Sequence, residues 1–402
     1  MSDHQPDLAA LRDRAAAFFR THGTPLGAAP SRTREPDAYL TAARAHQQAL
    51  YDAGLSGITW PEEHHGLGLS AAHETAFEEA AQDYEAYRDV FTIGLGMCGP
   101  VLMAKGTDEQ RRRHLGPMLR AEHLWCQLFS EPGAGSDLAA LSTAAVRDGD
   151  TWVVNGQKVW TSFAHHADYG LLLTRTDPDA PKHRGITMFI LDMHAPGVTV
   201  RPLRQATGDA EFNEVFLDGV RIPAENLVGE VNDGWRAATL MLANERLALR
   251  NNPISSGLDL DAVVRLIRGR GLTGDTVLRK RVADAYVAQL GVRLFAERIA
   301  RAASTGSDPG PLGSVGKVAA SRAARGLATL ALDAASEEAL AWDADDPQGD
   351  IWAHGELFAP SLSIAGGTEQ IQLTVLGERV LGLPRDPQGD RDTPFRQLRR
   401  NP

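Results

Sequence analysis

Small residues and hydroxyl side chains gather in one stretch of the sequence, QLFSEPGAGSD, which runs from Gln127 to Asp137. Residues this small let backbone N–H groups approach a planar or anionic ligand closely. No Gly-Lys-Ser/Thr follows, so the stretch is not a P-loop, and it lacks the Gly-x-Gly-x-x-Gly spacing of dinucleotide sites. Taken alone, the stretch is most typical of a glycine-rich turn.

A second group of residues that could bind a ligand is KVWTS, from Lys158 to Ser162. The indole of Trp160 can cover a flat heterocycle, and a neighbouring hydroxyl can donate a hydrogen bond to a ring nitrogen. The pair Asn155-Gly156 stands between two β-rich runs, and both residues tolerate a positive φ. The sequence therefore predicts a hairpin at this pair, with KVWTS on its second arm.

One carboxylate, Glu245, occurs at an apolar position of a predicted helix. It follows Ala238 and Met241 and precedes Leu249 at spacings that place all four residues on one helical face. A carboxylate on an apolar face costs several kcal/mol unless it is paired or neutralised. Two interpretations follow: a buried ion pair or polar notch between helices, or a functional carboxylate such as a catalytic base.

The elements that must position these residues fall into three zones of different periodicity. Apolar residues recur at helical spacing up to about Leu128 and again beyond Trp235. The residues between these zones form short β-rich runs, Thr151 to Val154, Val159 to Thr161, Tyr169 to Thr174, Gly185 to Leu191, Val198 to Val200 and Glu214 to Val220. The sequence predicts an α+β multidomain fold. Its expected domains are an N-terminal helical domain at 1–126, a central β domain at 127–234 and a C-terminal helical bundle at 235–402.

Composition and charge restrict the function classes. The net charge is -11, with both signs scattered along the chain, which argues against nucleic acid or an anionic membrane surface as a partner. No apolar run approaches the about 18 residues of a membrane span, and the first residues do not read as a signal peptide. Two cysteines, Cys98 and Cys126, form no CxxC pair. We therefore expect a cytoplasmic protein with free thiols and no metal site.

Four segments together, SEPGAGSD, NGQKVWTS, RGITMFILDM and FNEVFLDGVRIP, resemble the acyl-CoA dehydrogenase family. The resemblance implies a helical N-terminal domain, a β-barrel-like central domain and a C-terminal four-helix bundle. It implies bound FAD and the conversion of an acyl-CoA thioester to a trans-2-enoyl-CoA. It also implies electron-transfer flavoprotein as the electron acceptor, and a homo-oligomer, either a dimer or a tetramer.

The resemblance also assigns residues to sites. The residues expected to bind FAD are Gln127, Leu128, Phe129, Ser130, Gly135, Ser136, Trp160, Thr161, Ser162, Thr368 and Gln370. Those expected to bind the substrate are Ser136, Arg246 and Gly367. Ser162 stands where many members have a threonine, so a hydrogen bond from its hydroxyl toward flavin N5 is preserved.

The position of the catalytic base departs from the commonest family pattern. Many members carry a glutamate just before the Gly-Thr of a C-terminal motif, but here Gly366 occupies that position and cannot accept a proton. Glu369 follows nearby but points elsewhere around a helix. The isovaleryl- and long-chain-type members place the base on the first helix of the C-terminal domain, and the corresponding residue is Glu245. The next residue, Arg246, would orient the acyl ligand.

Other functions stay open. A flavin oxidase or monooxygenase on the same fold would use O₂ and need not depend on Glu245. A partner subunit of a mixed dehydrogenase assembly is a third alternative, because the Arg-x-x-Phe-Gly and Gln-x-x-Gly-Gly-x-Gly segments of the family's C-terminal domain are missing. An acyl-carrier-protein thioester could replace acyl-CoA, and the sequence does not define the acyl chain.

Overall fold

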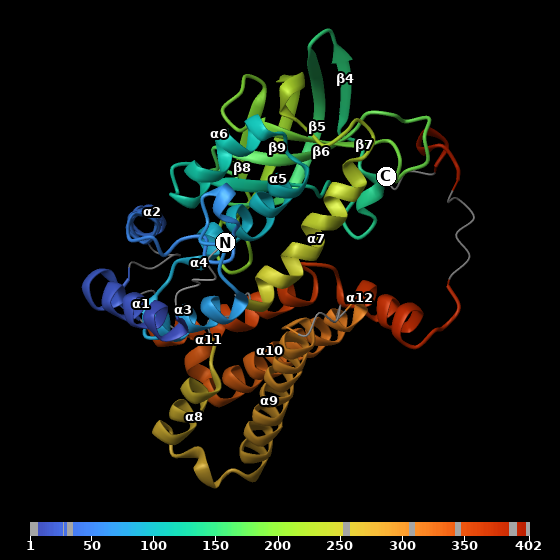
Figure 1. Ribbon diagram of the computed structural model, residues 1–402. Helices are drawn as coiled ribbons and strands as arrows, with labels where there is room; N and C mark the ends of the chain where they lie inside the picture. The colour runs from blue at the N-terminus through green and yellow to red at the C-terminus, as the bar shows by residue number, and fades with distance from the viewer. Residues whose placement is uncertain are drawn as a thin grey trace. The chain divides into compact units, whose positions relative to one another are not determined.

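A computed structural model describes residues 7–26, 28–29, 35–251, 258–304, 310–341, 347–385 and 392–398. The chain forms two compact units (Figure 1). The first unit comprises residues 1–203, 209–248 and 390–402. The second comprises residues 204–208 and 249–389. None of the helices in the described part of the chain is long and apolar enough to cross a membrane.

The first unit begins with helices. They and their short strands are α1 (Leu8–His22), β1 (Thr24–Pro25), α2 (Pro36–Asp52), α3 (Ala71–Ala81), β2 (Tyr84–Glu85), α4 (Arg88–Ile93), α5 (Gly99–Lys105) and α6 (Asp108–Leu119). The spacing of Leu11, Ala15 and Phe18 forms the buried face of α1, as the periodicity predicts. A capping box begins α6, because Thr107 and Gln110 each accept a hydrogen bond from the other's backbone N–H.

A β-sheet follows in the same unit. Its strands are β3 (Trp125–Leu128), β4 (Ala144–Asp148), β5 (Thr151–Ser162), β6 (Tyr169–Arg175), β7 (Ile186–Asp192), β8 (Val198–Pro202), β9 (Phe212–Pro223) and β10 (Leu227–Val228). The order is β10-β7-β6-β4-β5-β9-β8, and β3 pairs in parallel with β6. The expected β-rich runs at 169–174 and 185–191 correspond to β6 and β7, which are buried on both faces.

The two faces of β6 and β7 belong to two different cores. Leu171 and Met188 pack with residues of α5, α6 and α7 (Gly234–Asn251) in one core. Leu172 and Phe189 pack with β5 and β9 in the other core. This double burial explains why both strands are almost continuously apolar. It also fixes α7, which carries Glu245, against the sheet.

The predicted hairpin at Asn155-Gly156 is wrong. Strand β5 continues through this pair, and its pairing with β9 shifts register between Val154 and Gly156. Glycine is required here because Thr143 packs closely against the backbone, and not because the chain turns. A Cβ on Gly156 would lie 2.5 Å from the Oγ1 of Thr143. The chain reverses earlier, between Asp148 and Thr151, where β4 pairs with β5.

The helical zone also ends earlier than predicted. Trp125–Leu128 is a strand, although helical spacing was expected up to about Leu128. A short apolar run has no periodicity of its own to separate a buried strand from a buried helix. Strand β4 lay outside the predicted β-rich runs, because three of its residues are exposed and two are charged.

The second unit is helical in its described part. Its helices are α8 (Leu260–Gly269), α9 (Thr276–Ser304), α10 (Gly313–Ala335), α11 (Pro347–Phe358) and α12 (Glu369–Val375). Helix α10 lies at the centre of this bundle and contacts the other four helices. Its buried face is rich in alanine, including Ala328, Ala331 and Ala334, and such small side chains let neighbouring helices approach closely.

Candidate functional site

The structure brings together the two segments that the sequence singles out. The chain leaves β3 at Leu128 and runs beside β5, where the backbone N–H of Val159 donates to the carbonyl of Ser130 over 2.9 Å. The ammonium of Lys158 donates to the carbonyl of Phe129 over 3.0 Å. The loop after β3 and the KVWTS segment of β5 are therefore adjacent within the first unit.

The glycine-rich stretch forms a tight turn with an open surface. Glu131 and Ala134 exchange two backbone hydrogen bonds of 3.0 and 3.1 Å, and both residues are buried. Gly133, Gly135 and Ser136 are exposed. A Cβ on either glycine would meet no atom within 4 Å, so space lies above this backbone. The turn offers a smooth, small-residue surface to a ligand.

A buried ion pair holds this turn on β5. The Nζ of Lys158 lies 2.8 Å from the Oε1 of Glu131, and the Lys158 side chain is completely buried. The Glu131 carboxylate also accepts hydrogen bonds from the backbone N–H groups of Ser142 and Thr143, at 2.7 and 2.9 Å. These contacts join the beginning of the loop to its end.

The charges of this pair follow from its surroundings. Burial alone would raise the pKa of Glu131, but the Lys158 ammonium and the hydrogen bonds from Thr143 and Ser142 outweigh it and lower that pKa to about 2. Burial lowers the pKa of Lys158, and the Glu131 carboxylate opposes this shift. The Glu131 carboxylate is therefore ionised at neutral pH and balances the buried ammonium.

A second buried cation, Arg175 at the end of β6, holds the far part of the loop. Its guanidinium donates to the carbonyls of Ala139 and Leu141, over 2.6 and 3.2 Å. It also donates to the carbonyl of Lys182 over 2.7 Å. Burial lowers the pKa of Arg175 to about 10, so it stays charged at neutral pH.

The backbone at Trp160 has an unusual conformation. Its φ is 60°, in the left-handed region that a tryptophan rarely adopts, and β5 shifts register against β9 between Lys158 and Thr161. Trp160 is 61% exposed, and its indole makes an edge-type contact with the ring of Phe212. This irregularity presents an indole on the surface of an otherwise well-packed sheet. Strained residues of this kind concentrate at ligand sites.

The two hydroxyl residues after Trp160 differ in burial. Thr161 is buried, and its hydroxyl has no hydrogen-bond partner among the described residues. Its carbonyl accepts a hydrogen bond of 2.9 Å from the side-chain amide of Asn213. Ser162 is half-buried. The exposed indole and the partly exposed Ser162 hydroxyl are thus the polar and aromatic groups of this segment that a ligand can reach.

Glu245 lies on the buried face of α7, as its spacing predicts. Ala238 and Met241 on the same face are completely buried in the core, and Glu245 is 9% exposed. The side chain of Arg246 lies outside the described residues. The helix thus carries a carboxylate along the face that packs on the sheet.

The beginning of α7 is locked to β6 and β7. Asn232, at a φ of 67°, donates its backbone N–H to the Oγ1 of Thr187 over 2.8 Å. The Thr176 hydroxyl donates to the Oδ1 of Asn232 over 2.6 Å. A Cβ on Gly234 would lie 2.7 Å from the Cα of Thr187, so only glycine allows this approach. These contacts fix where the helix that carries Glu245 starts.

The remaining predicted residues lie in the second unit. Gly366 and Gly367 have positive φ values of 65° and 90°, and Thr368 caps α12 by accepting a hydrogen bond from a backbone N–H. The Nε of Arg322 donates to the carboxylate of Glu369 over 2.7 Å. Gln370 is exposed. Glu369 is thus part of an ion pair within this unit, which gives its carboxylate a structural role.

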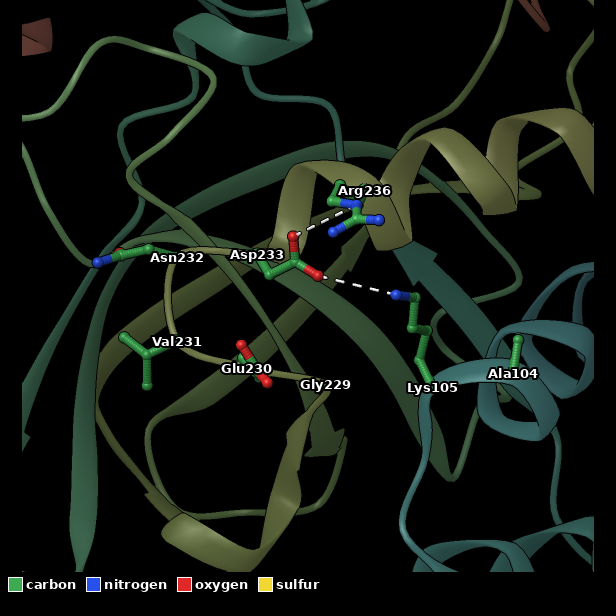
Figure 2. Close-up of a pocket in the computed structure, with 8 residues that line it drawn as sticks. All are labelled: Ala104, Lys105, Gly229, Glu230, Val231, Asn232, Asp233 and Arg236. Carbon is green, nitrogen blue, oxygen red and sulfur yellow. Dashed lines mark ion pairs between the residues drawn. The ribbon is translucent and has the colours of Figure 1, made fainter.

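A polar cavity of about 480 Å³ opens beside the N-terminal end of α7 (Figure 2). Asp233 lies 3.7 Å from both Lys105 and Arg236 in this cavity. Its lining contains none of the residues predicted for a cofactor or a substrate. No residue that lines this cavity therefore belongs to the glycine-rich loop or to β5.

Comparison with known proteins decides the family. Family models of the acyl-CoA dehydrogenase N-terminal, middle and C-terminal domains match residues 5–122, 126–220 and 232–381. Acyl-CoA dehydrogenase IpdE1 of Mycobacterium tuberculosis is 39% identical over 357 residues, which cover 89% of this chain and 91% of that protein. The chain belongs to the acyl-CoA dehydrogenase family. The resemblance and the fold expected from it are confirmed.

Other acyl-CoA dehydrogenases are similar over different lengths. FadE34 of Mycobacterium tuberculosis is 43% identical over 339 residues, and the match covers 84% of this chain but only 46% of FadE34. The solved ChsE4-ChsE5 complex from Mycobacterium tuberculosis is 29% identical, with a TM-score of 0.78 over 96% of this chain and 100% of that chain. The Tcur3481-Tcur3483 steroid ACAD is 26% identical, with a TM-score of 0.79 over 96% and 100%.

The sequence did not predict the buried charged residues that hold the glycine-rich loop after β3 in place. Glu131 and Lys158 stood inside the two motifs, but their pairing was not predicted. Arg175 was not considered at all. A signal was available, because Lys158 directly precedes one predicted β-rich run and Arg175 directly follows another. A charge in a buried strand needs a partner, and here the partners are the loop carboxylate and the loop carbonyls.

Proposed function

We propose that this chain is an FAD-dependent dehydrogenase that converts an acyl-CoA thioester to a trans-2-enoyl-CoA. The exposed Trp160 indole, held at a φ of 60° beside the open glycine-rich turn, carries the proposal. A flat aromatic face, nearby hydroxyls and an unobstructed small-residue backbone fit an isoalloxazine ring and its phosphate-bearing chain. Family membership supplies the chemistry that such a site would serve.

Most of the residues proposed to hold FAD lie in the first unit. In the first unit they are Gln127, Leu128, Phe129, Ser130, Gly135, Ser136, Trp160, Thr161 and Ser162. Thr161 is included although its side chain is buried and its carbonyl accepts a hydrogen bond from Asn213. Thr368 and Gln370, which belong to the second unit, stay FAD-binding candidates on the family resemblance alone. The division into domains at 126/127 and 234/235 is part of the same proposal.

Glu245 is proposed as the base that accepts the α-proton of the thioester. Bound FAD supplies the hydride acceptor for the hydrogen on Cβ. Glu245 suits its role because it is a carboxylate on a buried helical face whose start is fixed by Asn232. Ser136, Arg246 and Gly367 are proposed to bind the thioester. The alternative base Glu369 is engaged by Arg322.

The substrate and the electron acceptor are proposed only as classes of molecule. We propose acyl-CoA as the thioester, with an acyl-carrier thioester as the alternative, and electron-transfer flavoprotein as the electron acceptor. A cytoplasmic location follows from the sequence expectations. One similar solved structure is called a steroid ACAD. A ring-bearing acyl group therefore belongs beside straight, branched and aromatic acyl groups in any substrate panel.

The test is an anaerobic titration of the purified chain with that panel, followed by visible absorption. The proposal expects a yellow protein whose flavin bands bleach with one class of acyl-CoA. A yellow protein that never bleaches with an acyl-CoA or an acyl-carrier thioester would contradict it. Rapid reoxidation of the reduced flavin by air, with peroxide formed, would instead identify an oxidase.

A mixed assembly is the second candidate, because two of the similar solved structures have names that give two different chains. In that case the homo-oligomer expected from the sequence would be replaced by a pair of related chains. Mass measurement and flavin content of the chain purified alone separate the two proposals. A yellow dimer or tetramer supports the homo-oligomer, and a colourless chain that gains FAD only with a second chain supports the mixed assembly.

A further inference from the structure

The described C-terminal segment, residues 392–398, runs along the loop that follows β6. Pro394 forms a bridge with Pro181. The backbone N–H of Phe395 donates to the carbonyl of Ala180 over 2.9 Å, and that of Arg396 donates to the carbonyl of Pro178 over 3.0 Å. The segment belongs to the first unit.

Phe395 is the residue of this segment that reaches a buried charge. Its side chain is 5% exposed, and its ring centre lies 3.9 Å from the guanidinium carbon of Arg175. This cation–π contact covers one face of a planar group, which restricts the plane in which the Arg175 donors lie. Those donors bind the carbonyls of Ala139, Leu141 and Lys182.

Arg175 therefore joins the C-terminal segment to the end of the glycine-rich loop. Its backbone N–H also donates to the carbonyl of Thr143 over 2.6 Å. Lys182 closes a second link, because its ammonium lies 2.8 Å from a carboxylate oxygen of Asp137. The loop residues 137–143 are thus held by β6 and by the segment 177–182, and Phe395 packs where these two meet.

We propose that residues 392–398 are a positioning element for the cofactor loop, and that Phe395 acts through Arg175 without touching the ligand. The proposal rests on the proposed function for the identity of the ligand, FAD. Its structural part, that Phe395 orders the loop, is independent of that identity. Without the Phe395 ring, the Arg175 guanidinium can rotate. The carbonyls of Ala139 and Leu141 then lose a hydrogen-bond donor held in a fixed orientation.

The first measurement is hydrogen exchange on the chain freed of FAD. The amides of Ala140 and Leu141 donate within the loop, and those of Ser142 and Thr143 donate to Glu131, so all four report on loop order. Phe395→Leu keeps an apolar side chain but removes the π face. We expect about tenfold faster exchange at these amides in Phe395→Leu.

The matched control is Gln397→Ala, because the Gln397 side chain is exposed and no hydrogen bond joins it to another described residue, while its backbone N–H donates to the carbonyl of Pro394. It should leave the exchange rates unchanged. Exchange in β7, which belongs to the same unit as the loop, serves as the internal reference for global opening, which would accelerate every amide of that unit. Phe395→Tyr keeps the ring and should restore slow exchange.

The second measurement is the FAD dissociation constant, from quenching of flavin fluorescence. We expect it to rise about tenfold in Phe395→Leu and to stay at the parent value in Gln397→Ala and Phe395→Tyr. A lower melting temperature with unchanged loop exchange and unchanged FAD affinity would overturn the proposal. If the parent chain binds no FAD, the proposed function fails, and the exchange rates still decide whether Phe395 orders the loop.

Discussion

The ammonium nitrogen of Lys158 lies 2.8 Å from a carboxylate oxygen of Glu131, in a part of the first unit where both side chains are buried. One residue belongs to β5 and the other to the glycine-rich turn, so the pair determines how these two segments meet. Removing two charges from water is costly, and only good geometry with further hydrogen bonds offsets that cost. Ser142 and Thr143 provide those hydrogen bonds.

Lys158→Met should destabilise the chain strongly, because it leaves the Glu131 carboxylate buried without its counter-charge. We expect the free energy of unfolding to fall by about 3–5 kcal/mol. Glu131→Gln/Lys158→Met should lose less than the sum of the two single variants, since neither charge is then stranded. Urea unfolding of the four proteins measures this coupling. Strictly additive losses would show that the two charges stabilise the fold independently.

Trp160→Gly should separate folding from ligand binding. Glycine adopts a φ of 60° without strain, while a left-handed non-glycine residue costs about 1–2 kcal/mol. We therefore expect the stability of the cofactor-free chain to change by no more than about 1 kcal/mol, although the edge contact with Phe212 is lost. FAD affinity should fall about tenfold or more, because the exposed ring is missing.

Trp160→Phe is the matched control, since it keeps an aromatic face at the same backbone position. Its FAD affinity should lie between those of the parent chain and Trp160→Gly. Urea unfolding and flavin fluorescence quenching provide the two readouts. Equal FAD affinity in all three proteins would remove Trp160 from the proposed site.

The sequence predicted those parts of the fold and site that depend on local pattern. The buried face of α1 and the position of Glu245 on α7 follow from helical spacing, and β6 and β7 follow from short, mostly apolar runs. The hairpin failed because Asn155-Gly156 fits both a turn and a close approach of two strands. The choice depends on Thr143, which packs against Gly156 but lies outside the few residues of a local turn motif.

The buried charged residues of the site escaped prediction for the same reason. Arg175 and Ala139 are far apart in sequence, and so are Arg175 and Phe395. Their contacts are set by the parallel pairing of β3 with β6 and by the course of the C-terminal segment. Neither feature leaves a periodic trace in the sequence, since long-range pairing depends on the whole fold.

Acidification should destabilise the first unit before its carboxylates protonate. Burial lowers the pKa values of His46 and His114 to about 4, while an unfolded histidine has a pKa of about 6.5. The unfolded chain therefore binds more protons below pH 6.5, and stability falls as the pH drops from about 6.5 to about 4. Each histidine should contribute a loss of about 2 kcal/mol by pH 5.

His46→Phe tests this origin. The His46 ring packs among Phe18, Phe19 and Tyr87, and its Nε2 has no hydrogen-bond partner among the described residues. A phenyl ring fills the same space without titrating. Urea unfolding at pH 7, 6 and 5 should show a shallower pH dependence than that of the parent chain. An unchanged slope would assign the acid sensitivity to other groups.

Glu245→Gln should abolish turnover while FAD stays bound. The amide keeps the shape of the side chain on the buried face of α7 but cannot accept the α-proton, so we expect kcat to fall about 100-fold or more. Glu369→Gln is the matched control, because it tests the alternative base and removes only the charge facing Arg322. It should retain near-parent kcat, with stability lower by about 1 kcal/mol or less. The visible spectrum verifies flavin content in both variants, and steady-state assays measure kcat. The reverse result, turnover lost in Glu369→Gln and kept in Glu245→Gln, would move the base to the second unit and leave Glu245 as a structural carboxylate.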